Sequence, residues 1–126
     1  MARILLIEDN AANTSLTCFV LESAGHTVNS ATTAEIGISL VHDHRPDLIL
    51  MDIHLPGMDG LHATSLLKAD ASTREIPVVA LTALTMSGDE ARILAAGCDG
   101  YIAKPMRYLS LLAAVLTYIG RRVTAT

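Results

Sequence analysis

Short apolar runs alternate along the chain with longer segments in which apolar residues recur at helical spacing. Each run has the length of a buried strand and is bounded by polar residues, Gly or Pro. The most continuous run is L-I-L-M at 48–51, a pattern typical of a strand that is covered on both faces. We predict five strands, at residues 3–8, 26–30, 47–51, 76–81 and 101–103.

Five helices are predicted to follow these strands. The fourth is expected to open at the capping box Ser87-Gly88-Asp89-Glu90, in which the Ser hydroxyl and the Glu carboxylate satisfy backbone N–H groups, and to end at Gly97. The other helices are expected at residues 11–24, from a cap at Thr33 to the break at Pro46, at 60–69, and from 106 to about 120.

Apolar residues at helical spacing give each helix an expected inward face. In chain order these faces are Leu16, Phe19 and Val20; Ala34, Gly37, Ile38 and Val41; Ala63, Leu66 and Leu67; Ala91, Leu94 and Ala95; and Leu109, Leu112, Ala113 and Leu116. The last helix also has a second apolar line, made of Tyr108, Leu111, Val115 and Tyr118. A helix that is apolar on so much of its circumference is either deeply buried or contacts a partner.

The alternation of strands and helices predicts the fold class. Parallel neighbouring strands need a crossover connection, and crossovers are right-handed, so the helices cover both faces of a parallel sheet. We therefore predict a doubly wound α/β domain. With 126 residues, of which 51% are hydrophobic, the chain is expected to form one domain without a linker.

Charge and cysteine content exclude several classes of function. The formal net charge is -4 and the nine Lys and Arg residues are scattered, which argues against nucleic-acid binding. Cys18 and Cys98 lie far apart without metal-ligand spacing, and the first strand follows Met1 without a secretory leader, so two free thiols are expected. No apolar stretch reaches the roughly 20 residues of a membrane span. We expect a cytoplasmic protein that does not bind membranes.

Reactive side chains follow several of the predicted strands. Glu8 and Asp9 end the first strand, Asp52 the third, Thr82 the fourth and Lys104 the fifth. All carboxyl ends of a parallel sheet lie along one edge, where ligands of such folds bind. Three carboxylates without a counterion would repel one another, whereas Mg²⁺ accepts carboxylates while keeping waters and phosphate oxygens. The sequence predicts a magnesium-dependent phosphoryl site with Asp52 as the nucleophile, neutralised by Lys104 and the Thr82 hydroxyl.

Four motifs, in this order, resemble the receiver domain of two-component response regulators over essentially all 126 residues. They are I-E-D-N at 7–10, L-I-L-M-D-I-H-L-P-G-M-D-G at 48–60, A-L-T-A at 80–83 and G-Y-I-A-K-P at 100–105. The resemblance implies a flavodoxin-like (βα)5 fold with strand order 2-1-3-4-5. A weaker resemblance links the sequence to receivers of the cell-division phosphorelay and of hybrid kinases.

The resemblance implies a role for each acidic residue. Asp52 would accept a phosphoryl group from a phosphohistidine on a sensor histidine kinase or a His-phosphotransfer protein. Glu8, Asp9, Asp52 and the backbone carbonyl of His54 would hold Mg²⁺. Such a protein phosphorylates and dephosphorylates itself and is not a turnover enzyme.

The resemblance also implies roles around the phosphoryl group. Thr82 and Lys104 would contact its oxygens, and Tyr101 would be the switch aromatic that moves with Thr82. His54 and Leu84 would tune how fast water removes the phosphoryl group.

The sequence argues against three other functions. A phosphorylation-independent docking module on the same fold is the main alternative, and the complete set of acids, Thr and Lys argues against it. A hydrolase with an aspartyl intermediate would need a second acid where His54 stands. A flavin-binding loop would be rich in Ser, Thr and Gly, whereas E-D-N-A-A-N is acidic.

The two ends of the sequence bear on whether further domains are expected. Met1 directly before the first strand and the polar tail V-T-A-T favour a stand-alone receiver at 1–126, without an output domain, over an excised piece of a larger regulator.

The face made by the fourth helix, strand 101–103 and the last helix is expected to change on phosphorylation and to dock a downstream protein or a second copy.

Overall fold

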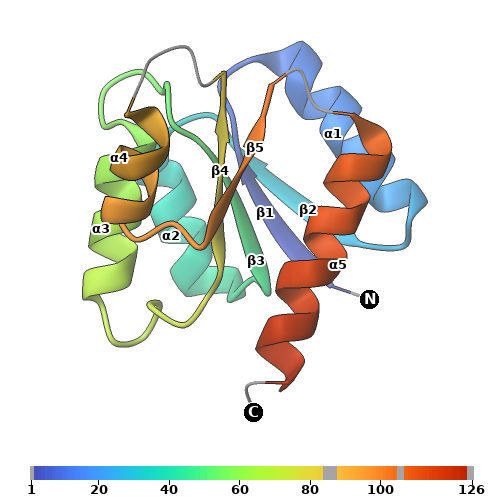
Figure 1. Ribbon diagram of the computed structural model, residues 1–126. Coiled ribbons are helices and arrows are strands. Elements are labelled where there is room, and N and C mark those ends of the chain that lie inside the picture. Colours follow the sequence, from blue (N-terminus) through green and yellow to red (C-terminus); the bar gives the residue numbers. More distant parts are fainter. Residues whose placement is uncertain (1, 84–87, 105–106, 125–126) are drawn as a thin grey trace.

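The computed structural model describes residues 2–83, 88–104 and 107–124, and its centre is a parallel sheet (Figure 1). The strands are β1 (Arg3–Ile7), β2 (Thr27–Ala31), β3 (Leu48–Asp52), β4 (Val78–Thr82) and β5 (Gly100–Ala103). Their order is β2-β1-β3-β4-β5, and every neighbouring pair is parallel. The predicted fold class and strand order are confirmed, and each strand was predicted to within two residues at either end.

The helices lie in two layers, one on each face of the sheet (Figure 1). They are α1 (Ala11–Ser23), α2 (Ala34–His44), α3 (Gly60–Ala69), α4 (Asp89–Ala95) and α5 (Tyr108–Thr124). Helices α1 and α5 cover one face, and α2, α3 and α4 cover the other. Because both faces are covered, β3 and β4 are buried along their whole length, and the sheet separates two hydrophobic cores. Among the described residues, no helix has the length and apolar character needed to cross a bilayer.

Side-chain caps fix where three of the helices begin. Asn10, Thr33 and Asp59 each accept a hydrogen bond from the backbone N–H three residues later, which satisfies a donor that the helix itself leaves unpaired. The capping box predicted for the fourth helix is wrong. Gly88 is the N-cap of α4, in the left-handed region at φ 92°, and it offers no side-chain oxygen. Ser87 lies outside the described residues.

The inward face predicted for the last helix is also wrong. Leu111 and Val115 of α5 are buried, whereas Leu109 and Leu116 are 82% and 65% exposed. Both lines of the helix are apolar, so spacing alone could not decide which one faces the sheet. The phase is set by a docking contact at β5, where the Tyr118 hydroxyl donates to the carbonyl of Asp99 at 3.3 Å and occupies the space that a side chain at residue 100 would fill.

On three of the other helices, helical spacing again predicted only part of the buried face. On α1, Val20 is buried as predicted, but Leu16 and Phe19 are 47% and 69% exposed, and Thr17 and Leu21 take their place. On α4, Ala91, Leu94 and Ala95 are exposed and Ile93 is buried. On α3, Ala63 and Leu67 are buried, whereas Leu66 is exposed. The predicted face of α2 is confirmed, with Ala34, Gly37 and Val41 buried and Ile38 half-buried.

Truncating one residue from each apolar line of α5 tests the corrected face. Leu111→Ala is expected to lower the free energy of unfolding by about 2–5 kcal/mol, because it leaves a cavity in the core. Leu109→Ala is expected to change it by less than about 0.5 kcal/mol, because its side chain is mostly in solvent. Urea denaturation of both variants measures the difference, and equal losses would contradict the assignment.

Candidate functional site

The carboxyl ends of four strands bring together residues that are far apart in the sequence. Asp52 is the last residue of β3 and Thr82 the last of β4, while Glu8 directly follows β1 and Lys104 directly follows β5. The register pairs Ile7 with Met51, Asp52 with Leu81 and Thr82 with Ala103. These ends therefore form one continuous edge, where parallel α/β folds bind their ligands.

Three carboxylates converge at this edge. Glu8, Asp9 and Asp52 each offer an oxygen within 4.8 Å of the others. Glu8 is 1% and Asp52 4% exposed, whereas Asp9 is open to solvent. The cluster thus has a buried base and one exposed side, through which a ligand can enter.

Lys104 supplies the positive charge that this cluster needs. Its Nζ lies 3.0 Å from Asp52 Oδ2 and 3.1 Å from Glu8 Oε1. Burial alone would lower the pKa of the Lys104 ammonium, but its hydrogen bonds to Asp52 and Glu8 outweigh burial and leave this pKa raised. The side chain is therefore charged and links the ends of β1, β3 and β5.

The two buried acids have different protonation behaviour. Burial opposes ionisation of Asp52, but its contacts with Glu8, with the backbone N–H of His54 and with Lys104 leave its pKa lowered. The His54 N–H donates to Asp52 Oδ1 at 2.9 Å. Burial and the neighbouring Asp52 carboxylate raise the pKa of Glu8 to about 7. Asp52 is thus held as the carboxylate, and Glu8 takes up the proton that the pair binds near neutral pH.

The donor set fits a hard divalent cation. Glu8 Oε2 is buried and accepts no hydrogen bond from the described residues, and such an atom is costly unless something else satisfies it. Three carboxylates against one ammonium also leave an excess of negative charge. Carboxylate oxygens beside open solvent are the ligands that Mg²⁺ takes in proteins while it keeps several waters.

The remaining predicted site residues surround this cluster to different extents. Thr82 is buried, and its carbonyl accepts the backbone N–H of Lys104 at 2.8 Å. His54 is exposed on the loop after β3. Tyr101 is half-buried against the core under α2, α3 and α4, and the neighbouring Glu90 carboxylate raises the pKa of its hydroxyl. Leu84 lies outside the described residues.

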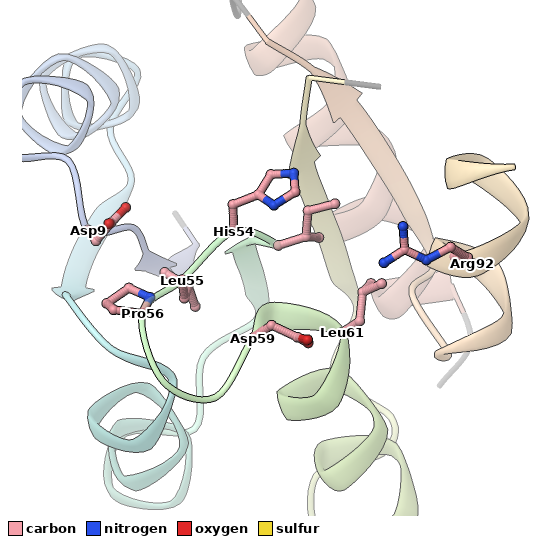
Figure 2. A pocket seen from close by; sticks show the side chains of 8 residues that line it. Asp9, His54, Leu55, Pro56, Asp59, Leu61 and Arg92 are labelled. Carbon is pink, nitrogen blue, oxygen red and sulfur yellow. The ribbon is translucent and has the colours of Figure 1, made fainter. Parts of the chain in front are cut away.

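Two features near the site were not predicted from the sequence. The first is Gly60, where a Cβ would overlap the carbonyl oxygen of Asp52 and lie 2.8 Å from Ile53 Cα. The second is an open pocket of about 440 Å³ that runs from Asp9 along the loop after β3 to Arg92 of α4 (Figure 2). No spacing in the sequence signals that Arg92 reaches this pocket, because it depends on how α4 packs.

The raised pKa of Glu8 predicts a pH-dependent affinity for Mg²⁺. A proton on Glu8 would compete with a cation bound by this carboxylate, so the apparent affinity for Mg²⁺ is expected to fall about tenfold between pH 8 and pH 6. Isothermal titration calorimetry at several pH values measures the apparent affinity for Mg²⁺. Glu8→Gln should bind Mg²⁺ more weakly and with little pH dependence in this range, and an equally steep dependence in that variant would contradict the assignment.

The Glu8 carboxyl group also affects the stability of the fold when Mg²⁺ is absent. The folded-state pKa of Glu8 lies above its ordinary value of 4.5, so the native state binds more protons than the unfolded chain between pH 4.5 and about 7. The contribution of Glu8 to stability is therefore complete below pH 4.5 and is lost as the pH rises to about 7. The pKa of Asp52 is lowered from its ordinary value of 3.8, so its own effect on stability is confined to more acidic pH and does not overlap this window.

Comparisons of the sequence and the fold with known proteins all identify relatives of one kind, response regulator receiver domains. The family model described as response regulator receiver domain matches residues 4–116. The polar-differentiation response regulator DivK of Brucella anthropi is 40% identical over 117 residues, which cover 93% of this chain and 95% of that protein. The receiver domain of a sensor histidine kinase from Pseudomonas aeruginosa, solved with magnesium coordinated in its active-site cleft, is 35% identical with a TM-score of 0.88 and covers 94% of this chain and 98% of that one. A CheY-like receiver domain protein from Methanospirillum hungatei is 28% identical with a TM-score of 0.91, covering 100% and 99% of the two chains.

Proposed function

The chain belongs to the response regulator receiver domain family, and from that premise we propose that Asp52 is its phosphoacceptor. The observation that carries the proposal is the environment of the Asp52 carboxylate. It is buried and ionised at a strand end, with Lys104 on one oxygen and the His54 N–H on the other. A carboxylate so oriented is a competent nucleophile for phosphorus.

In the proposed reaction, one oxygen of Asp52 attacks the phosphorus of a phosphohistidine. The new O–P bond forms as the N–P bond of the donor breaks, and the donor imidazole leaves with the electron pair of that bond. The receiver's task is to position the two groups and to neutralise the oxygens of the transferred phosphoryl group. Lys104 is in place for this, because it already contacts Asp52 Oδ2 at 3.0 Å.

We propose Mg²⁺ as the cofactor, held by Glu8, Asp9, Asp52 and the backbone carbonyl of His54. The buried, unsatisfied Glu8 Oε2 and the convergence of the three carboxylates support this set. The cation would supply positive charge opposite the phosphoryl oxygens. Magnesium in the cleft of the related Pseudomonas receiver is consistent with the proposal.

The other residues are assigned by position in the family motifs. Thr82 and Lys104 would contact the phosphoryl group, and Tyr101 would move when Thr82 is drawn toward it. His54 and Leu84 would tune hydrolysis. The partner would be a sensor histidine kinase or a His-phosphotransfer protein, and the chain itself would act as a phosphoacceptor that also loses its own phosphoryl group, not as a turnover enzyme.

Intact-mass spectrometry tests the proposal. Incubation of the protein with a small acyl phosphate and Mg²⁺ is expected to give a single phosphoryl adduct, and chelation of Mg²⁺ should prevent it. The adduct should be lost on treatment with hydroxylamine, which cleaves acyl phosphates. Absence of an adduct with both the small donor and a phosphorylated histidine donor would favour a docking module that works without phosphorylation.

A further inference from the structure

The pocket in Figure 2 begins at the exposed side of the carboxylate cluster. It is lined by Asp9, which belongs to that cluster, and by Ile53 and His54, which follow Asp52 in the chain. Its volume of about 440 Å³ is in the range of pockets that bind small ligands. The phosphoryl chemistry proposed for Asp52 uses the near edge of this pocket and leaves the rest of it without a role.

Arg92 of α4 supplies positive charge to the pocket. Among the described residues that line it, Arg92 is the only one that is charged positively at every pH. Its side chain is 61% exposed and extends from α4 toward Leu61 and His54 (Figure 2). Arg92 Nη1 donates to Asp89 Oδ1 at 3.0 Å, and this largely buried carboxylate holds the guanidinium in place. A guanidinium has five N–H donors in a planar fork, so one such pair leaves donors for an anion in the pocket.

The other lining residues make the pocket suitable for a small organic anion. The Asp59 carboxylate is engaged in capping α3, where it accepts the His62 N–H at 2.8 Å. Asp9 belongs to the set proposed to hold Mg²⁺, which would offset its charge. The apolar walls are made by Ile53, Leu55, Pro56 and Leu61. Apolar walls with one oriented guanidinium fit a carboxylate that carries a hydrocarbon group.

The position of Asp52 determines where the leaving group of a phosphodonor goes. The attacking and leaving atoms lie roughly in line through phosphorus. Asp52 is at the buried base of the cluster and Asp9 is open to solvent, so the leaving group departs on the open side. The pocket begins on this side, because Asp9 belongs both to the cluster and to the pocket lining.

We propose that Arg92 makes this chain selective for small acyl phosphates, by donating to the carboxylate that leaves when Asp52 takes the phosphoryl group. The inference rests on the proposed function of Asp52. An Asp52 oxygen forms the new bond to phosphorus, the bond between phosphorus and the acyl oxygen breaks, and its electron pair stays on the departing carboxylate. Negative charge grows on that oxygen during the step, so a donor placed there stabilises the transition state more than the ground state. A donor whose leaving group departs as a neutral amine gains little from Arg92.

Phosphorylation rates with a series of ring-substituted benzoyl phosphates test the proposal. These donors carry the same charge but release benzoates of different basicity, so attraction at long range affects them all alike. In Arg92→Gln, the rates are expected to fall about tenfold, and most for the most basic benzoate, so that the rate depends more steeply on leaving-group basicity. With phosphoramidate, which releases ammonia, the variant should react within about twofold of the unaltered chain. Intact-mass spectrometry of quenched samples measures each rate.

Arg74→Gln is the matched control for Arg92→Gln. It removes the same charge from an exposed arginine between α3 and β4, where β4 begins and not where it ends at the site. This variant should keep the rates of the unaltered chain with every donor. Thermal unfolding of both variants should show that they remain folded, since both side chains are largely exposed.

Two results would overturn the proposal. One is a loss of the same size with every donor, phosphoramidate included, because Arg92 would then act through the fold or through Asp52. The other is an Arg92→Gln variant whose rates depend on leaving-group basicity as those of the unaltered chain do. Failure of the proposed function looks different, since no donor would then phosphorylate even the unaltered chain, and the inference would fail with it.

Discussion

Asp52→Asn is expected to abolish the phosphoryl adduct while the protein stays folded. The amide has the shape of the carboxylate but no negative oxygen with which to attack phosphorus. The carboxylate accepts from the His54 N–H on one oxygen and from Lys104 on the other, and the amide oxygen can keep only one of these two contacts, so one hydrogen bond is lost. Removing one of three converging carboxylates also relieves repulsion, so the free energy of unfolding should not fall by more than about 1 kcal/mol.

Asp59→Asn is the matched control for this variant. Asp59 lies seven residues further along the same loop, where its side chain caps α3 by accepting the N–H of His62 at 2.8 Å. Asn caps helices as well as Asp does, so this variant should form the adduct at the rate of the unaltered chain. Intact mass and peptide mapping measure both variants. An adduct of normal yield on the Asp52→Asn protein would show that another residue is the phosphoacceptor.

The strands and their order were predictable because a buried parallel strand has a strong local signal. The run at 48–51 is apolar on both faces because β3 lies between neighbouring strands and beneath helices of both layers. Once five such strands alternate with helices, right-handed crossovers leave few arrangements of the sheet. The strand ends then follow, and with them the neighbourhood of Glu8, Asp52 and Lys104.

The phase of the helices was not predictable in the same way. A helix with two apolar lines, such as α5, satisfies the same periodicity in either orientation, and its true orientation depends on the contact between Tyr118 and the backbone of β5. This contact joins residues that are far apart in the sequence. Leu109 and Leu116, which were expected in the core, are mostly exposed for this reason.

The convergence of Glu8, Asp9, Asp52 and Lys104 was predictable from the sequence, but the surrounding residues that hold them in place were not. The types of residue at the strand ends indicate a cation and a phosphoryl group. The pKa of Glu8 depends on burial, and the reach of Arg92 depends on how α4 packs, and neither has a signature in the sequence. Gly60 could be recognised only as the residue after a helix cap. Its close approach to the peptide of Asp52 requires coordinates.

Gly60→Ala is expected to slow phosphorylation of Asp52 about 100-fold, because a displacement of about 1 Å in a reacting group has an effect of that size. Gly60 is the first residue of α3, and its N–H donates to the carbonyl of Ile53 at 3.3 Å. A methyl group at this position would overlap the Asp52 carbonyl oxygen, which is backbone and cannot rotate away. Either the start of α3 or the peptide of Asp52 must therefore shift, and the carboxylate shifts with it.

Gly37→Ala separates this positioning effect from a loss of stability. A Cβ at Gly37 would also meet a buried neighbour, with Ile7 Cγ1 at 2.7 Å, but that neighbour is a side chain in the core beneath α2. Overpacking of this kind costs about 1–3 kcal/mol, and a comparable loss is expected for Gly60→Ala. If the Gly60 effect on the phosphorylation rate came only from reduced stability, both variants would be slowed alike at a temperature where both are folded. A Cβ at Gly60 would meet the backbone of Asp52, whereas one at Gly37 would meet only the Ile7 side chain. Only Gly60→Ala should therefore be slow, and adding more Mg²⁺ or donor should not restore its rate.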